Sequence, residues 1–145
     1  MKIYETTFDI DASAADVWRV LTDTAAYGQW NPSLPAISGD LTPGSTLKMT
    51  LGLPGRPSMN VKAQIKEFEP DSLFTWEGHL VTDRFFKGRR EFHIVPVGEN
   101  RVSFTHVERL TGPFVPVFLL MMREAPQRGH DAFNAALRQR AESVR

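Results

Sequence analysis

The spacing of apolar and polar residues changes twice along the chain. Residues 3–10 alternate between the two kinds, which predicts a strand. Apolar residues then recur at helical spacing over residues 14–22, with Asp11 or Ser13 as the candidate N-cap. One further helical turn is expected before Pro32. These patterns predict a first strand followed by two short helices.

Residues 36–110 carry the signals of consecutive antiparallel strands. Apolar and polar residues alternate along them, so each strand has one buried face and one solvent-exposed face. Gly, Pro, Asn and Asp mark the turns between the runs, and about six strands in a meander follow from this spacing. The turns fall at residues 42–44, 54–57, 70–71 and 98–100.

The chain from Phe114 onward is rich in helix formers, and its apolar residues form one helical stripe over about seven turns. Pro126 lacks a backbone N–H, so we expect a kink or break between residues 122 and 126. The dry face of the sheet needs a cover, and this long helix is the element left to provide it. The sequence therefore predicts an α+β fold in one domain, residues 1–145, with a curved antiparallel sheet of about seven strands around a long C-terminal helix. A space between the helix and a sheet of this width is expected, and such spaces commonly hold ligands.

Several segments together carry a family resemblance. In chain order they read VWRVLTDTAAYGQWNP, GDLTPGSTL, LFTWEG, FTHVERLTG and AFNAALRQRAE. This order resembles the START-like, Bet v 1-like (SRPBCC) superfamily, and within it the polyketide cyclase/dehydrase-related branch, over about residues 3–142. The resemblance implies a helix-grip fold with a hydrophobic cavity. The superfamily includes lipid carriers, hormone receptors, cyclases and chaperone activators, so the fold alone does not settle the chemistry.

One position departs from this resemblance. Many relatives carry His in a run of the form G-x-H-x-F, whereas this chain has Arg90 between Gly88 and Phe92. The role that the resemblance gives to that imidazole is therefore not carried over to position 90.

The segment FTHVERLTGP, residues 104–113, mixes apolar and ionisable residues on one side of a predicted strand. Because side chains alternate along a strand, Phe104, His106, Glu108 and Leu110 point the same way. That side is either a solvated sheet surface or the wall of an internal cavity that needs a few polar groups.

The register of the hairpin decides between these two interpretations. A three-residue loop at 98–100, which pairs Val97 with Arg101, places Arg90 opposite Glu108. The dry residues of both strands then mark the inward face, so the mixed side of the segment is predicted to face the cavity together with Arg90. A slip of one residue would reverse this assignment.

Three polar residues are the catalytic candidates: Arg90, His106 and Glu108. Arg90 and Glu108 form either a structural ion pair or a pair that orients a polar group of a ligand, because a lone buried charge is costly. His106 is either a core histidine with satisfied hydrogen bonds or a general acid–base. In an enzyme, His106 would move a proton next to a carbonyl group, and Arg90 would stabilise the enolate.

The predicted ligand-binding residues are mostly aromatic or sulfur-containing. Trp30 and Trp76 either stack on a flat ligand or pack the core. The helix surface that faces the sheet either fills the core or lines a pocket. Arg56 lies in a predicted turn that in this fold can sit over the entrance. The full set is Trp30, Trp76, Phe86, Phe92, Phe104, His106, Glu108, Phe114, Phe118, Met121 and Met122.

Composition narrows the function classes. The chain has no cysteine, and its 17 Lys and Arg balance 17 Asp and Glu, so thiol chemistry is excluded and no overall field favours nucleic acid. Its four histidines are scattered and no phosphate-binding or zinc motif occurs, so neither a metal nor a cofactor is expected. The polar, alternating N-terminus and the short apolar runs predict a cytoplasmic protein without stable membrane insertion.

The leading hypothesis is a protein that binds a small hydrophobic, ring-containing molecule in an internal cavity, with Arg90, His106 and Glu108 as its polar contacts. The second hypothesis is a polyketide cyclase or dehydratase that uses the same cavity. The third is an interaction module of the chaperone-activator kind. The sequence leaves open the identity of the ligand, the existence of a reaction and the oligomeric state.

Overall fold

The computed structural model describes residues 1–80 and 82–144, and its centre is one curved antiparallel sheet. Within these residues, seven strands lie in the order β1-β7-β6-β5-β4-β3-β2, so consecutive strands from β2 to β7 are neighbours and β1 pairs with β7. The meander predicted from the turn residues is thereby confirmed. The strands are β1 (Lys2–Ile10), β2 (Ala36–Ser38), β3 (Thr46–Leu51), β4 (Met59–Glu69), β5 (Leu73–His79), β6 (Lys87–Gly98) and β7 (Arg101–Thr111).

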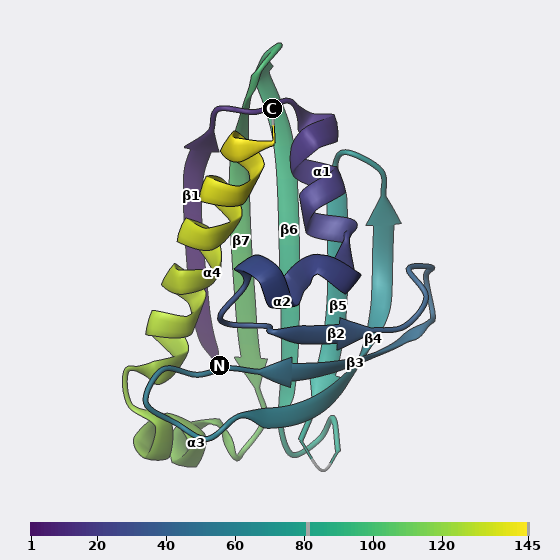
Figure 1. Ribbon diagram of the computed structural model, residues 1–145. Coiled ribbons are helices and arrows are strands. Elements are labelled where there is room, and N and C mark those ends of the chain that lie inside the picture. The colour runs from purple at the N-terminus through teal and green to yellow at the C-terminus, as the bar shows by residue number, and fades with distance from the viewer. Residues whose placement is uncertain (81, 145) are drawn as a thin grey trace.

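The helices cover one face and one end of this sheet. Figure 1 shows α1, α2 and α4 in front of the sheet and α3 at its lower end. This arrangement confirms the predicted helix-grip fold. No helix in the described part of the chain is long and apolar enough to cross a membrane. The helices are α1 (Ala14–Thr22), α2 (Tyr27–Trp30), α3 (Val115–Met122) and α4 (Ala125–Ser143), with a 3-10 turn at Thr24–Ala26.

The helix predicted at the C-terminal end is broken into α3 and α4. Arg123, between them, has φ +54°, a left-handed value that residues with a side chain rarely adopt. Pro126 lies in the first turn of α4, where its missing N–H interrupts no helical hydrogen bond. The break is therefore where the proline predicted it, and α3 is free to take a direction of its own.

The hairpin of β6 and β7 has the predicted register but a different turn. Arg90 lies opposite Glu108, as expected. Gly98, and not Val97, lies opposite Arg101, and the register shifts just before this glycine. The predicted three-residue loop is therefore wrong. The extra residue is absorbed as a bulge, which leaves the inward face of both strands unchanged.

The buried apolar residues fall into two clusters. The larger one lies between the sheet and helices α1, α2 and α4, and includes Phe92 and Phe133, whose rings stack with centroids 5.2 Å apart. The smaller one lies where α3 meets the sheet, and includes Tyr4, Phe86 and Phe118. Because the two clusters are separate, the space between them is the natural place for a cavity.

Substitution of Phe133 by Ala should test the packing of the larger cluster. The ring is fully buried, so its removal leaves a void and should lower the free energy of unfolding by about 3–5 kcal/mol. Leu120→Ala is the control, because Leu120 is 78% exposed and its truncation should change that free energy by less than about 0.5 kcal/mol. Urea unfolding of both variants measures the difference, and equal losses would contradict the assignment of the core.

Candidate ligand-binding cavity

An apolar cavity of about 110 Å³ lies between the two hydrophobic clusters. Its walls come from strands β3 to β7, from α3 and from the first turns of α4. Pockets that hold drug-sized molecules are larger, about 300–1,000 Å³. An engineered apolar cavity of about 150 Å³ is known to accept benzene. The cavity in this structure is therefore of the size of a single ring.

Arg90 and Glu108 make one end of the cavity polar. Arg90 Nη2 donates to Glu108 Oε1 over 3.0 Å, and each side chain is only 13% exposed. The guanidinium carbon lies 5.9 Å from the ring centre of Trp76 and 5.6 Å from that of Phe133. Nη1 is buried and has no hydrogen-bond partner among the described residues. Arg90 therefore has a donor left over after it has paired with Glu108.

Two buried histidines stack beside this pair. His106 on β7 and His130 on α4 have ring centres 4.0 Å apart and planes inclined by 13°. His106 Nδ1 lies 2.7 Å from Asn134 Oδ1, an acceptor, which places the proton of the imidazole on Nδ1. His130 Nε2 lies 3.1 Å from the hydroxyl of Thr6. The other nitrogen of each ring is buried and lacks a hydrogen-bond partner in the described part of the chain.

The charges of the cluster follow from burial and neighbours. Burial alone would raise the pKa of Glu108, but Arg90 and His130, whose Nδ1 is 3.9 Å from Glu108 Oε1, outweigh it and hold that pKa below its ordinary value. Burial lowers the pKa of His106 well below its ordinary value; Arg90 and His130 add to this, and the hydrogen bond with Asn134 opposes it. At neutral pH Glu108 is thus a carboxylate, and His106 is uncharged.

His106, Glu108 and His130 also offer three potential metal-ligand atoms, all within 4.8 Å of one another. A metal ion needs the lone pairs of its imidazole ligands to converge on one point, about 2.0–2.1 Å from each nitrogen. Nearly parallel rings direct their lone pairs into two separate planes, and Arg90 already neutralises Glu108. The geometry is therefore that of a hydrogen-bonding site rather than a metal centre.

Comparison with known proteins places this arrangement in a family. Residues 1–142 match the sequence profile of the family described as polyketide cyclase / dehydrase and lipid transport. The chain belongs to this family. No curated protein matches it in sequence.

Solved structures of the same fold come from several sources. The Zhui aromatase/cyclase from a Streptomyces species is similar with a TM-score of 0.77 and 15% identity, over 99% of this chain and 96% of that chain. A START superfamily protein from Mycobacterium smegmatis has a TM-score of 0.76 and 20% identity, over 99% of each chain. Norcoclaurine synthase from Thalictrum flavum, solved with dopamine and hydroxybenzaldehyde, has a TM-score of 0.64 and 22% identity, over 91% of this chain and 83% of that chain. At these identities the likeness concerns the fold.

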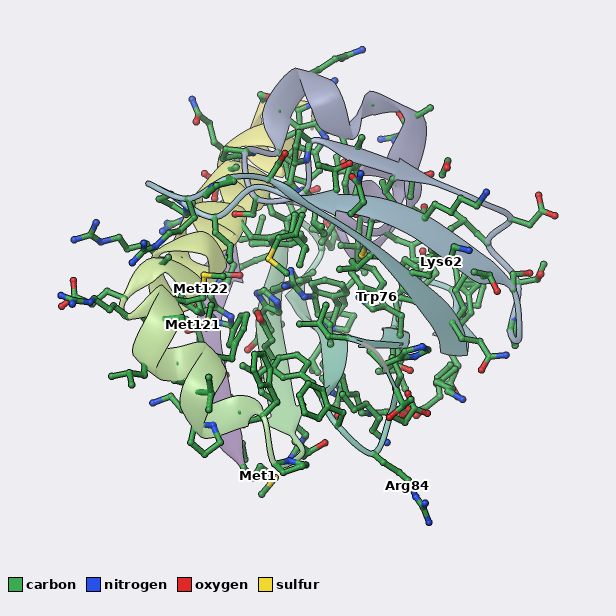
Figure 2. The ribbon with its side chains drawn as sticks, turned by 90° about the horizontal axis from the view of Figure 1, so that it is seen from below. Met1, Lys62, Trp76, Arg84, Met121 and Met122 are labelled. Atoms are coloured by element: carbon green, nitrogen blue, oxygen red, sulfur yellow. The ribbon has the colours of Figure 1, made fainter. Side chains whose placement is uncertain are left out.

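Some of the residues predicted as a site meet on the wall of this family member's cavity. They are Arg90, Glu108, Trp76, Phe86 and Phe118. Figure 2 shows Trp76 in the interior of the molecule, whereas Met121 and Met122 lie on helix α3. The predicted meeting of the β6 and β7 residues with α3 is therefore present in the structure.

Other predicted residues do not line the cavity. Phe92 and Phe104 are fully buried in the larger cluster, and His106 is equally buried, stacked on His130. Trp30 packs against Tyr27 and Phe133. These side chains belong to the packed interior that supports the cavity wall.

The predictions for α3 and its flank need a correction. Met121 was expected to face the sheet, but it is 55% exposed. Met122 and Phe114 pack against the smaller cluster, and Phe114 also stacks on Phe85 at 4.8 Å. The break at Arg123 turns α3 away from the direction that a continuous helix would have had, which explains why Met121 points outward.

His130, Asn134 and Thr6 contribute to this cluster but were not among the predicted site residues. A signal for His130 was available, because it precedes Phe133 by three residues and Leu137 by seven, and so shares their buried helix face. The prediction that the histidines are scattered is wrong for His106 and His130, which the fold brings into contact.

The buried state of His106 predicts how stability depends on pH. The folded protein keeps His106 neutral, whereas in the unfolded chain it binds a proton below about pH 6.5. Acidification therefore favours the unfolded state, and this group alone should lower the free energy of unfolding by about 1.4 kcal/mol per pH unit near pH 5–6. His106→Gln keeps a donor for Asn134 but does not titrate, so its unfolding free energy should change less over this range. Parallel curves from urea unfolding at several pH values would show that His106 is not held neutral.

Proposed function

We propose that the protein binds a small, mostly apolar, ring-containing molecule whose one hydrogen-bond acceptor is held by Arg90. The observation that supports this is the buried Nη1 of Arg90, which lacks a partner at the polar end of an otherwise apolar cavity. A buried donor without a partner costs about 1–3 kcal/mol. An acceptor on the ligand would remove that cost, while burial of the ring would contribute about 25 cal/mol per Å².

Charge balance favours an uncharged acceptor. Arg90 and Glu108 are ionised and neutralise each other. A ligand carboxylate would add a net buried charge to this pair, which is costly in an apolar site, whereas a carbonyl or phenol oxygen would add none. The preferred ligand is thus an aromatic ketone, aldehyde or phenol. Hydroxybenzaldehyde, in the complex of norcoclaurine synthase, is a compound of this kind held by the same fold.

Two probes of equal shape test the role of Arg90. Acetophenone and α-methylstyrene differ in that a carbonyl oxygen replaces a methylene group. The affinity ratio of ketone to hydrocarbon should fall by about tenfold when Arg90→Met is combined with Glu108→Gln, because one hydrogen bond to a charged donor is lost. The double substitution avoids leaving Glu108 as a lone buried charge. Ligand-observed NMR titration gives both affinities.

Retention of fold by the double variant is checked by circular dichroism. An unchanged ratio in a folded variant would remove Arg90 from ligand recognition. Failure of both probes to bind the wild-type protein would contradict the proposed function itself.

A second candidate function, a polyketide cyclase or dehydratase-like enzyme, is favoured by His130. This histidine lines the cavity, its Nδ1 lacks a hydrogen-bond partner among the described residues, and the carboxylate of Glu108 is 3.9 Å away. A base beside a carbonyl held by Arg90 could take a proton from the adjacent carbon, and the guanidinium would stabilise the enolate. Here His130 would act as the base, and His106, behind it, would position its ring. The chaperone-activator hypothesis stays a prediction.

Proton exchange between the ligand and the solvent distinguishes the enzyme hypothesis from the binding-protein hypothesis. In D₂O, an enzyme of this kind should speed deuterium incorporation into the methyl group of acetophenone, and His130→Gln should reduce that rate by about a hundredfold or more while acetophenone still binds. ¹H NMR follows the loss of the methyl signal. Wild-type protein that binds acetophenone without raising the exchange rate above buffer would exclude the enzyme and retain the binding function.

A further inference from the structure

The outward face of α3 is apolar and uncovered. Residues 110–122, which include the helix, contain no charged residue. Val117, Leu120 and Met121 on this helix are 47%, 78% and 55% exposed. Figure 2 looks onto this end of the molecule and shows Met121 on α3. Adjacent exposed apolar side chains of this size commonly mark an interaction surface.

The inward face of the same helix closes the cavity. Phe118 lines the cavity and packs on Phe86, with ring centres 4.9 Å apart. The backbone N–H of Phe114 donates to the carbonyl of Phe85, and a Cβ at Gly112 would clash with that carbonyl, so the chain after β5 and the start of α3 are held together. The exposed apolar face is thus the outer side of the cavity wall.

A basic groove adjoins α3. It has a volume of about 370 Å³ and is lined by Arg56, Arg123, Arg128 and Glu124, with Met122 of α3 on its wall. Arg128 pairs with Glu124 over 3.1 Å. In the part of the chain that the structure describes, neither Arg56 nor Arg123 has an ion-pair partner. The groove therefore carries an excess of positive charge directly beside the apolar helix.

We propose that α3 and this arginine groove dock the protein on an anionic phospholipid surface. Leu120 and Met121 would enter the boundary between headgroups and acyl chains, and Arg56 and Arg123 would meet lipid phosphates, since an apolar face beside arginines matches that boundary. A second copy of the chain is a poorer occupant, because a two-fold contact around α3 would bring the two arginine grooves toward each other. A lipid surface also offers apolar molecules to the cavity behind Phe118, a consequence that rests on the proposed function.

Sedimentation with vesicles tests the docking surface. The wild-type protein should bind vesicles of phosphatidylcholine with phosphatidylglycerol better than vesicles of phosphatidylcholine alone, and salt should weaken the difference. Leu120→Gln with Met121→Gln should lower the vesicle partition coefficient by about tenfold or more. Both side chains are exposed, so the fold is expected to persist. Val95→Gln with Val97→Gln, two exposed valines near the β6–β7 turn, is the matched control and should bind as the wild type does.

A second pair of substitutions tests the groove. Arg56→Gln with Arg123→Gln should remove the preference for anionic vesicles while binding to neutral vesicles stays the same. The proposal is overturned if the wild-type protein binds neither kind of vesicle, or if the valine variant loses as much binding as the α3 variant. It is also overturned if light scattering shows that the wild-type protein is a dimer and the α3 variant is a monomer, since self-association would then explain the exposed face. Acetophenone binding by the α3 variant in solution reports on the cavity independently.

Discussion

The ion pair of Arg90 and Glu108 is the contact on which the interior of this protein depends. Either charge alone would be costly to bury between an apolar cavity and a packed core, but opposed across β6 and β7 they neutralise each other at 3.0 Å. Trp76 and Phe133 lie near the guanidinium and keep it from water. The pair therefore gives the cavity a polar end without a net buried charge, and it leaves one Arg90 nitrogen without a hydrogen-bond partner among the described residues.

The parts of this site that the sequence could predict are those set by strand periodicity. Side chains alternate strictly along β6 and β7, so the dry residues Phe92 and Phe104 were enough to assign Arg90 and Glu108 to the inward face, and even a wrong turn at Gly98 did not disturb that assignment. The contribution of α4 was harder to predict, because it depends on how the helix is rotated against the sheet. The exposure of α3 could not be read from its apolar sequence, since it depends on the direction the chain takes after the break.

The departure from the family resemblance at position 90 changes how the chemistry is distributed. A guanidinium stays protonated at any ordinary pH, so Arg90 can donate hydrogen bonds and stabilise negative charge but cannot accept a proton. If the cavity performs acid–base chemistry, the proton must pass to another residue. His130, on a different element, has a buried nitrogen without a hydrogen-bond partner in the described part of the chain and lies on the cavity wall. A single imidazole can supply both the positive charge and the base. In this chain Arg90 on β6 would supply the charge, and His130 on α4 would be the base.

The division of the interior into two clusters gives the cavity two walls of different stability. The volume of about 110 Å³ is bounded on one side by the larger cluster, where stacked rings such as Phe92 and Phe133 hold the sheet to α4. On the other side it is bounded by the smaller cluster with Phe118 of α3. Displacing α3 would disturb the smaller cluster and leave the larger one intact, so the opening should require much less free energy than unfolding. The stability of the fold and the adaptability of the cavity thus rest on different sets of residues.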